Sequence, residues 1–216
     1  MGAVERHLGA SGTTFRAAVG GDCRRIAELV RIASEGVTDY VWSTLAPEYP
    51  GMALIEVGAI RYSDEESVFS YKNCVVAEHD GEVIGLLLSF PVEVESGASS
   101  GEPVDLVLEP YSMEVPGSFY ICSLAVLPES RGLGIGRKML DIARERARER
   151  GLDTLSLLVF EQNQGACRLY EREGFALVDR AQVVPHELIH YTGDVLLMAA
   201  EARRNGMAEQ PRRREP

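Results

Sequence analysis

The sequence predicts a single α/β domain, and three observations carry this prediction. Apolar runs that fit strands alternate along the chain with segments whose apolar residues recur at helical spacing. The chain contains no internal repeat. Its 216 residues, 45% hydrophobic and 25% charged, have the composition of a globular protein and suffice for one sizeable core without disulfides or metal.

The first elements follow from alternation and turn chemistry. Residues 13–19 alternate as a strand does, and a Gly-Gly-Asp turn follows in which Asp22 would cap the next helix. Apolar residues at helical spacing then predict an amphipathic helix to about Ser34. Two prolines interrupt the apolar pattern of residues 37–62, which predicts one or two short helices there.

The middle of the chain predicts a hairpin, a loop and a buried strand. Residues 73–78 and 82–90 flank His-Asp-Gly, and an Asp-Gly between apolar runs is typical of a β-hairpin. Residues 96–117 predict a loop or a mobile insertion, because they are rich in Gly, Ser, Pro and acidic side chains. The continuous apolar run 119–127 predicts a central strand buried on both faces.

The last third alternates helices and strands. An apolar stripe from Ile135 predicts a helix that Gly151 ends. The remaining predictions are a strand over 154–160, a short helix over 165–172, strands over 175–184 and 195–200, and a disordered tail from 203.

Charge limits the classes of partner. With 33 acidic and 22 basic side chains the formal net charge is −11, which argues against sequence-independent binding of nucleic acid or an anionic membrane. The excess is local: residues 1–118 hold 19 acidic and 7 basic side chains, whereas residues 119–180 hold 9 and 10. The second segment is therefore the one suited to an anionic ligand.

Cysteine spacing and hydropathy predict a cytoplasmic protein. The longest apolar run, 83–92, is half of a bilayer span, and the N-terminus has no hydrophobic signal region. The cysteines form no CxxC pair, as expected of reduced, buried thiols rather than a disulfide framework or a zinc site. They are Cys23, Cys74, Cys122 and Cys167.

A glycine loop, Arg131-Gly-Leu-Gly-Ile-Gly136, stands between the apolar run and the following helix. Glycines let backbone N–H groups turn toward a ligand at the positive end of the helix dipole, which makes an anion site, and Arg137 and Lys138 add charge. A P-loop would need Gly-Lys-Ser/Thr, and a dinucleotide fingerprint would need GxGxxG; neither matches. On its own the loop could also be a tight connection.

A second motif lies one helix and one strand further on, Asn163 to Phe175, with the pattern NxxAxxLYxxxGF. Together with LAVLPESRGLGIG, residues 124–136, it resembles the paired motifs of the GNAT superfamily of acyl-CoA-dependent N-acetyltransferases. The resemblance covers roughly residues 13–200, and the two motifs at this separation are highly specific.

The resemblance implies a mixed, mostly antiparallel sheet of six to seven strands with helices on both faces, in which strands four and five splay apart. It implies one N-acetyltransferase domain over 13–200 with a flexible N-terminus, 1–12, and a disordered tail, 201–216. Within the domain it implies an acceptor-side half, 13–118, an acetyl-CoA core, 119–180, and a C-terminal hairpin, 175–200.

The resemblance also implies the residues of an acetyl-CoA site. Asn163 would bind the pantetheine arm or orient the thioester, and Tyr170 would protonate the departing CoA thiolate. Tyr170 could instead be a core aromatic packed on Phe175. The other implied cofactor contacts are the strand residues Leu124, Ala125 and Val126, the pyrophosphate loop of Arg131, Gly132, Leu133, Gly134, Ile135, Gly136 and Arg137, and Ala166.

The general base is where the chain departs from the family. Some members carry a glutamate five residues before the asparagine, and Leu158 stands there. A protonated amine cannot attack a thioester, so its proton needs another route. The alternatives are a water chain held by backbone carbonyls and Ser123, or an acid or histidine from the first half, with Glu114 and His79 as candidates.

A competing motif, His186-Glu-Leu-Ile-His190, matches the HExxH pattern of zinc proteases. That pattern requires a helix, a third ligand and a cleft. Pro185 precedes it and Thr-Gly follows, so we expect a connection between the last two strands and no metal site. The histidines could still line the pocket for the acceptor.

The predicted function is transfer of an acetyl group from acetyl-CoA to a small-molecule or peptide amine, by direct attack in a ternary complex and without nucleic acid or membrane partners. A homodimer is a candidate assembly. The alternatives are an inactive acyl-CoA-binding module, favoured by Leu158, and, more distantly, a zinc hydrolase.

Two groups of residues on the acceptor side carry further expectations. The carboxylates Asp64, Glu65 and Glu66 predict a solvated turn. The aromatic residues that could form core or pocket wall are Trp42, Tyr49, Tyr62, Phe69 and Tyr71.

Overall fold

A single seven-stranded sheet organises the computed structural model, which describes residues 12–94 and 105–203. Its strand order is β1-β2-β3-β4-β5-β7-β6, and every neighbouring pair is antiparallel except β4 and β5. The predicted mixed, mostly antiparallel sheet is confirmed. The strands are β1 (Thr13–Ala17), β2 (Cys74–His79), β3 (Glu82–Pro91), β4 (Phe119–Val126), β5 (Thr154–Phe160), β6 (Ala176–Gln182) and β7 (Asp194–Glu201).

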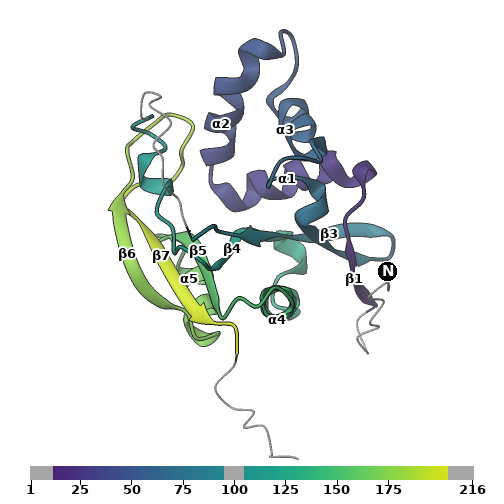
Figure 1. Ribbon diagram of the computed structural model, residues 1–216. Helices are drawn as coiled ribbons and strands as arrows, with labels where there is room; N and C mark the ends of the chain where they lie inside the picture. The colour runs from purple at the N-terminus through teal and green to yellow at the C-terminus, as the bar shows by residue number, and fades with distance from the viewer. Residues whose placement is uncertain (1–11, 95–104, 204–216) are drawn as a thin grey trace, which may run out of the picture.

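Helices cover both faces of this sheet (Figure 1). The interrupted segment 37–62 forms two helices, separated by a short 3-10 turn that contains Pro47. The helices are α1 (Cys23–Ser34), α2 (Val37–Leu45) and α3 (Leu54–Ser63) on the first face, and α4 (Ile135–Glu149) and α5 (Gln164–Arg172) on the second.

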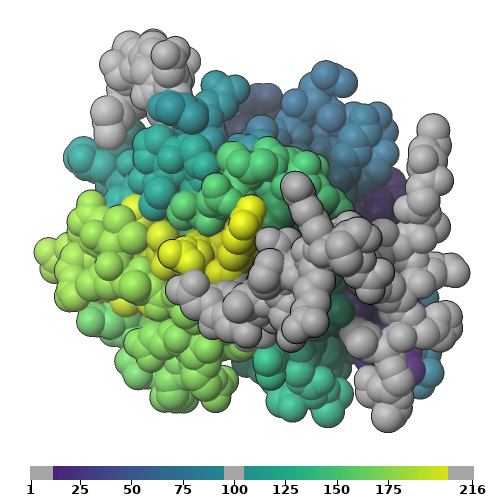
Figure 2. All heavy atoms as spheres, turned by 60° about the horizontal axis from the view of Figure 1, so that its bottom comes forward, coloured from purple at the N-terminus to yellow at the C-terminus, as the bar shows by residue number. Residues whose placement is uncertain are grey.

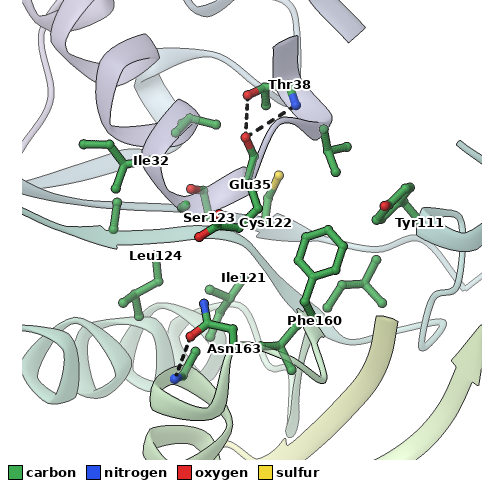
Figure 3. Close-up of a pocket in the computed structure, with 18 of the residues that line it drawn as sticks. Ile32, Glu35, Thr38, Tyr111, Ile121, Cys122, Ser123, Leu124, Phe160 and Asn163 are labelled. Carbon is green, nitrogen blue, oxygen red and sulfur yellow. Dashed lines mark hydrogen bonds between the residues drawn. The ribbon is translucent and has the colours of Figure 1, made fainter. Parts of the chain in front are cut away.

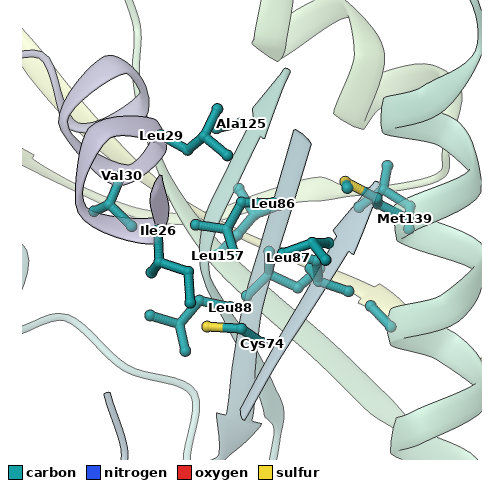
Figure 4. Packing of buried hydrophobic residues seen from close by; sticks show 14 of the residues in the cluster. Ile26, Leu29, Val30, Cys74, Leu86, Leu87, Leu88, Ala125, Met139 and Leu157 are labelled. Carbon is teal, nitrogen blue, oxygen red and sulfur yellow. The ribbon is translucent and has the colours of Figure 1, made fainter. Parts of the chain in front are cut away.

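The core lies on both sides of β3, which is why this strand reads as a continuous apolar run. Leu86, Leu87 and Leu88 are fully buried although consecutive side chains of a strand point to opposite faces. Ile26 of α1 packs from one side and Met139 of α4 from the other (Figure 4). Each such side chain contributes roughly 1.5–3 kcal/mol through the hydrophobic effect.

Strands β4 and β5 separate soon after they begin to pair. Their parallel register covers only 119–121 against 155–157. On the other edge of β4 the register with β3 shifts, so that Cys122 is an extra residue in a β-bulge. The bulge bends β4 away from its parallel neighbour, and strands four and five are splayed as predicted.

The bulge also changes which way β4 side chains point. Tyr120 packs edge-on against Phe90, with ring centroids 5.7 Å apart. Leu124 would lie on the same face of a regular strand, but it points toward α4, where its Cδ2 is 3.6 Å from the position of a Cβ on Gly136. The expectation that 119–127 is buried on both faces is wrong, because buried and half-buried residues alternate along β4 and the half-buried ones line a cleft.

Three smaller expectations are changed by the structure. Asp22 does not cap α1 with its side chain, because its carboxylate accepts hydrogen bonds from Arg16 and from the backbone N–H of Val19. Glu201 ends β7 and is therefore not part of a tail. The predictions for residues 1–11, for the loop centre 95–104 and for the tail beyond 203 lie outside the described residues.

The four cysteines are free thiols, as expected; Cys122 is half-buried and the other three are buried. Within 12–94 and 105–203 no helix is both long and apolar enough to cross a bilayer. At the far edge of the sheet β6 is exposed along nearly its whole length, and its light green surface stands out at one side of Figure 2.

The turn between α1 and α2 is pinned against the connection between β6 and β7. Gly36 has a φ of +95°, and a Cβ there would overlap the carbonyl oxygen of Leu188. Beside it the backbone N–H of His190 donates to the carbonyl of Glu35 at 2.9 Å. We call this contact between 35–36 and 188–190 the turn clasp.

Replacing Gly36 by alanine tests the turn clasp. Gly51 has a similar φ of +83° but open space around a Cβ, so Gly51→Ala carries the left-handed strain of about 1–2 kcal/mol without the clash. Gly36→Ala adds overpacking of about 1–3 kcal/mol. We expect its melting temperature to lie about 2–12 °C below that of Gly51→Ala by thermal unfolding. Equal melting temperatures would mean that the turn clasp is not rigid.

Candidate functional site

A cleft of about 1460 Å³ opens where β4 and β5 separate. Residues from both faces of the sheet line it: the ends of α1, α2 and α3 on one side, and the start of α4 with α5 on the other. Figure 3 shows Ile121, Cys122, Ser123 and Leu124 of β4 along one wall, with Asn163 below them. A molecule bound in this cleft can therefore be reached from either face.

The edge of β4 that faces the cleft carries unpaired backbone groups. After Ile121 no residue of β5 pairs with it, so the N–H and C=O groups on this edge over 122–126 have no strand partner. One of them is used by a side chain, because Arg131 Nε donates to the carbonyl of Val126 at 3.1 Å. The predicted backbone contacts Leu124, Ala125 and Val126 all line the cleft.

The glycine loop has the conformation that its sequence requires. Gly132 and Gly134 have φ of +81° and +78°, in the left-handed region that favours glycine, and Gly134 immediately precedes α4. The first N–H groups of α4 lack partners within the helix and carry its positive dipole end. Arg131, Gly132, Gly134, Ile135, Gly136 and Arg137 line the cleft.

Two residues that were predicted to contribute to the anion site are not part of the cleft lining. Leu133 is 64% exposed and does not line the cleft, and neither does Lys138. Arg137 does, and its Nε lies 3.4 Å from a carboxylate oxygen of Glu173. The second oxygen of Glu173 is 3.2 Å from buried Arg144, so one carboxylate joins the start and the middle of α4 to the end of α5.

Asn163 is held by the helix that it begins. Its Oδ1 accepts the backbone N–H of Ala166 at 3.1 Å, which caps α5. Its Nδ2 makes no hydrogen bond to any other described residue. Both Asn163 and Ala166 line the cleft, so the side chain combines a structural contact with a donor left for a ligand.

Tyr170 packs in the core and also borders the cleft. Its ring packs at 5.6 Å from Phe175 in the core, and the residue is 7% exposed. It also lines the cleft, and its hydroxyl has no hydrogen-bond partner in the described part of the chain. Burial raises the pKa of Tyr170 well above the usual phenol value, so the hydroxyl stays protonated at neutral pH.

The structure separates the candidate proton acceptors. Glu114 lines the cleft, and Tyr120 stands near it: desolvation, then the charges of Cys122 and Glu114, raise the pKa of that phenol. Ser123 also lines the cleft, with a buried hydroxyl that has no partner among the described residues. His79 lies at the end of β2, beside Thr13, and is outside the cleft. Leu158 does line the cleft.

Four charged residues of the cleft were missed by sequence reasoning: Glu35 and Arg61, which lie at the ends of α1 and α3, and Arg172 and Glu173 at the end of α5. Glu35 ends α1 with a φ of +50°, and its side chain is 26% exposed; Figure 3 shows it on the α1 side, opposite Ser123. Arg61 lies in the last turn of α3, with its guanidinium 4.3 Å from the ring centroid of Phe69. Nothing in the sequence around either residue differs from an ordinary helix end, so no signal marked them.

The HExxH segment is not a helix, as expected. The ring of His186 packs edge-on against Tyr40 at 4.6 Å, and its Nδ1 accepts the N–H of Leu188. Neither His186 nor His190 lines the cleft, so the expectation that they border the acceptor pocket is wrong. No group of three or more His, Cys, Asp or Glu side chains in the described ranges is placed to hold a metal ion.

The aromatic set divides between the cleft and the surface. Trp42, Tyr62 and Phe69 line the cleft, while Tyr49 borders a smaller pocket of about 310 Å³. Tyr71 donates to Glu65 on the exposed turn that also holds Asp64 and Glu66, which confirms the solvated turn. Further aromatic residues of the cleft are Phe90, Tyr111, Tyr120, Phe160 and Tyr191.

The sequence profile of the Acetyltransferase (GNAT) family matches residues 38–175, more than half of the chain. The chain belongs to the GNAT family. The match contains the glycine loop, the bulged β4 and Tyr170, whereas the part of the cleft formed by the end of α1, Tyr191 and Val195 lies outside it.

Curated relatives of this GNAT chain are acetyltransferases. A mycothiol acetyltransferase from Cellulomonas flavigena is 29% identical over 128 residues, which cover 59% of this chain and 33% of that protein. A thialysine N-epsilon-acetyltransferase from Bos taurus is 30% identical over 160 residues, covering 74% of this chain and 82% of that protein. The chain thus spans less than half the length of the mycothiol acetyltransferases that it matches.

Solved GNAT structures share the fold. The crystal structure of an acetyltransferase superposes with a TM-score of 0.63 at 26% identity, covering 88% of this chain and 99% of the other. A GNAT family acetyltransferase from Elizabethkingia anophelis with acetyl-CoA bound has a TM-score of 0.54 at 16% identity, covering 89% and 99%. The second likeness is one of fold alone.

Substitution of Asn163 tests its cap of α5. Asn163→Ala removes the cap of α5 and should cost about 1 kcal/mol of unfolding free energy, whereas Asn163→Asp keeps an accepting oxygen and should stay close to the parent. Chemical denaturation measures both. A loss in Asn163→Asp as large as that in Asn163→Ala would show that the cap is not the stabilising contact.

Proposed function

We propose that this GNAT chain transfers an acetyl group from acetyl-CoA to an amine by direct attack in a ternary complex. The observation that carries the proposal is a cleft open to both faces of the sheet at the splay of β4 and β5. Acetyl-CoA would lie along the glycine loop and α5, and the acceptor would enter between α1, α2 and α3. The two reactants would meet beside the bulge at Cys122.

Backbone groups would hold most of the cofactor. The N–H groups at the start of α4 and in the loop 131–137 form an anion site for the pyrophosphate, to which Arg131 and Arg137 add charge. The free edge of 124–126 offers hydrogen bonds to the pantetheine arm and to the carbonyl oxygen of the thioester. The Nδ2 of Asn163, with Ala166 beside it, offers another donor to the arm.

Direct attack agrees with the state of the cysteine in the cleft. Desolvation raises the pKa of Cys122 to about 12, although the nearby charge of Arg61 opposes this. The thiol therefore stays protonated at neutral pH and is a poor nucleophile. An acetyl-enzyme intermediate on Cys122 is disfavoured, and the amine would attack the thioester carbon itself.

Tyr170 would supply the proton that the leaving sulfur needs. As the N–C bond forms and the C–S bond breaks, the phenol donates its proton to the CoA thiolate. The acceptor ammonium gives up two protons in the whole reaction: one leaves before attack, and the other restores Tyr170. Ser123 and Glu114 line the cleft and would take part in removing the first of these two protons.

An acyl-CoA-binding module without catalysis is the second candidate, because Leu158 places no carboxylate on β5 in the cleft. One assay separates the two functions: release of free CoA thiol in the presence of amines, polyamines, amino acids, aminoglycosides and peptides. Binding of acetyl-CoA without thiol release from any of these would favour the module.

Acetyl-CoA should raise the melting temperature of the parent by about 5–11 °C at a concentration near 100 Kd. Gly134→Val should abolish this protection, because a β-branched residue is strained at a φ of +78° and distorts the anion site. Gly151→Val is the matched control: its φ is +69°, a Cβ has open space, and it follows α4 at the opposite end. Absence of protection in the parent would contradict the proposed function.

Tyr170→Phe should lower kcat by about 100-fold while leaving the affinity for acetyl-CoA unchanged. Because burial raises the pKa of Tyr170, its acid form is lost only at a pH above that raised value. The parent should therefore show no alkaline fall in kcat below about pH 10. Binding and rate that fell together in Tyr170→Phe would identify the residue as structural.

A further inference from the structure

The basic side chains on the acceptor side of the sheet are neutralised by carboxylates, with one exception. Within the described residues 12–94, Arg61 alone has no carboxylate within 4 Å. This segment of the chain has a large acidic excess, so partners for a cation are abundant nearby. The paired residues are Arg16 with Asp22 and Glu78, Arg24 with Glu28 and Glu56, Arg25 with Glu28 and Glu82, Arg31 with Asp39, and Lys72 with Glu65.

Arg61 borders the cleft and packs against one of its aromatic rings. The residue is half-buried, lines the cleft, and stacks its guanidinium on the Phe69 ring at 4.3 Å. Stacking uses the face of the guanidinium and leaves its in-plane N–H groups free to bind a planar anion in a bidentate manner. No described residue accepts a hydrogen bond from them.

An anionic group bound to Arg61 would not be the pyrophosphate of the cofactor. Arg61 lies on the face of the sheet that carries α1, α2 and α3, whereas the glycine loop leads into α4 on the other face. Its charge acts on Cys122, which is four residues, or about 13 Å of strand, before Val126 and the loop. A ligand group at Arg61 therefore belongs to the acceptor.

A carboxylate lies elsewhere in the same cleft and would bind a cationic group. Glu35 presents a carboxylate from the end of α1, and His190 Nδ1 lies 3.7 Å away from it on the solvent side. Aromatic side chains also line the cleft, with Phe69 packed edge-on against Phe90 and Phe90 against Tyr120. The cleft thus holds the Arg61 guanidinium, the Glu35 carboxylate and an aromatic wall, in addition to the carboxylate of Glu114.

We infer that the acceptor is an amine that also carries a carboxylate, with the carboxylate on Arg61, the ammonium group directed to Glu35 and carbon chain or ring along the aromatic wall. A single guanidinium balances a carboxylate, and a dianionic phosphate would need more positive charge than this acidic half offers. Amino acids and ω-amino acids have this chemistry. The inference rests on the proposed function and narrows its acceptor.

The first test compares amines that differ only in the carboxylate. The pairs are lysine and cadaverine, 6-aminohexanoate and hexylamine, and phenylalanine and phenethylamine, assayed by CoA thiol release with the full chain. In the accepted pairs we expect kcat/KM to be at least about 10-fold higher for the carboxylate member. Equal or better use of the decarboxylated members overturns the inference but leaves acetyl transfer intact. Acetyl-CoA binding without acetylation of any amine would instead contradict the proposed function.

The second test assigns the effect to Arg61. Arg61→Gln should raise KM for the carboxylate member by about 10-fold to 100-fold and leave KM for acetyl-CoA and for the decarboxylated member unchanged. Arg61→Lys should restore part of the loss, because it returns the charge without the planar fork. Arg24→Gln, which removes an arginine outside the cleft, should match the parent. Equal losses for both members in Arg61→Gln would mean a structural role and overturn the inference.

Discussion

The incomplete pairing of β4 with β5 is the constraint on which the rest of the site depends. Unpaired backbone N–H and C=O groups are costly when they are removed from water, so a strand edge cannot simply be buried in a core. Here the pairing stops after Ile121, the bulge at Cys122 turns the strand, and the free edge faces a cleft rather than side chains. Helices on both faces wall this opening, and two molecules can therefore meet at one edge.

Local sequence patterns predict most of the strands and helices and part of the candidate site. Most strands and helices follow from apolar runs, alternation, helical spacing or a turn signal, and the glycine loop and Asn163 lie in contiguous motifs whose geometry is set within a few residues. The bulge was not predictable, because a continuous apolar run carries no sign of an extra residue. Arg61 and Glu35 were missed for a different reason: each looks like an ordinary helix end, and only the packing of distant segments places them in the cleft.

Several side chains that line the cleft also stabilise the fold. Asn163 caps α5 with its oxygen, Tyr170 packs on Phe175 while its hydroxyl stays free, and Glu173 joins Arg137 to the buried Arg144. Substitutions at such positions change stability and binding together, which is why matched variants that keep one contact are needed. Different atoms of the same side chain thus contact the core and the cleft.

The turn clasp joins residues that lie far apart along the chain, since Glu35 receives the N–H of His190. Closing a contact of this length carries a large loop entropy, so it forms late unless other contacts have already shortened the loop. During synthesis the segment near 190 emerges after nearly all of the sheet. The surroundings of Glu35 therefore reach their final form only after residues 188–190 have been synthesised, and a nascent chain with a finished glycine loop still lacks the contact that holds this end of α1.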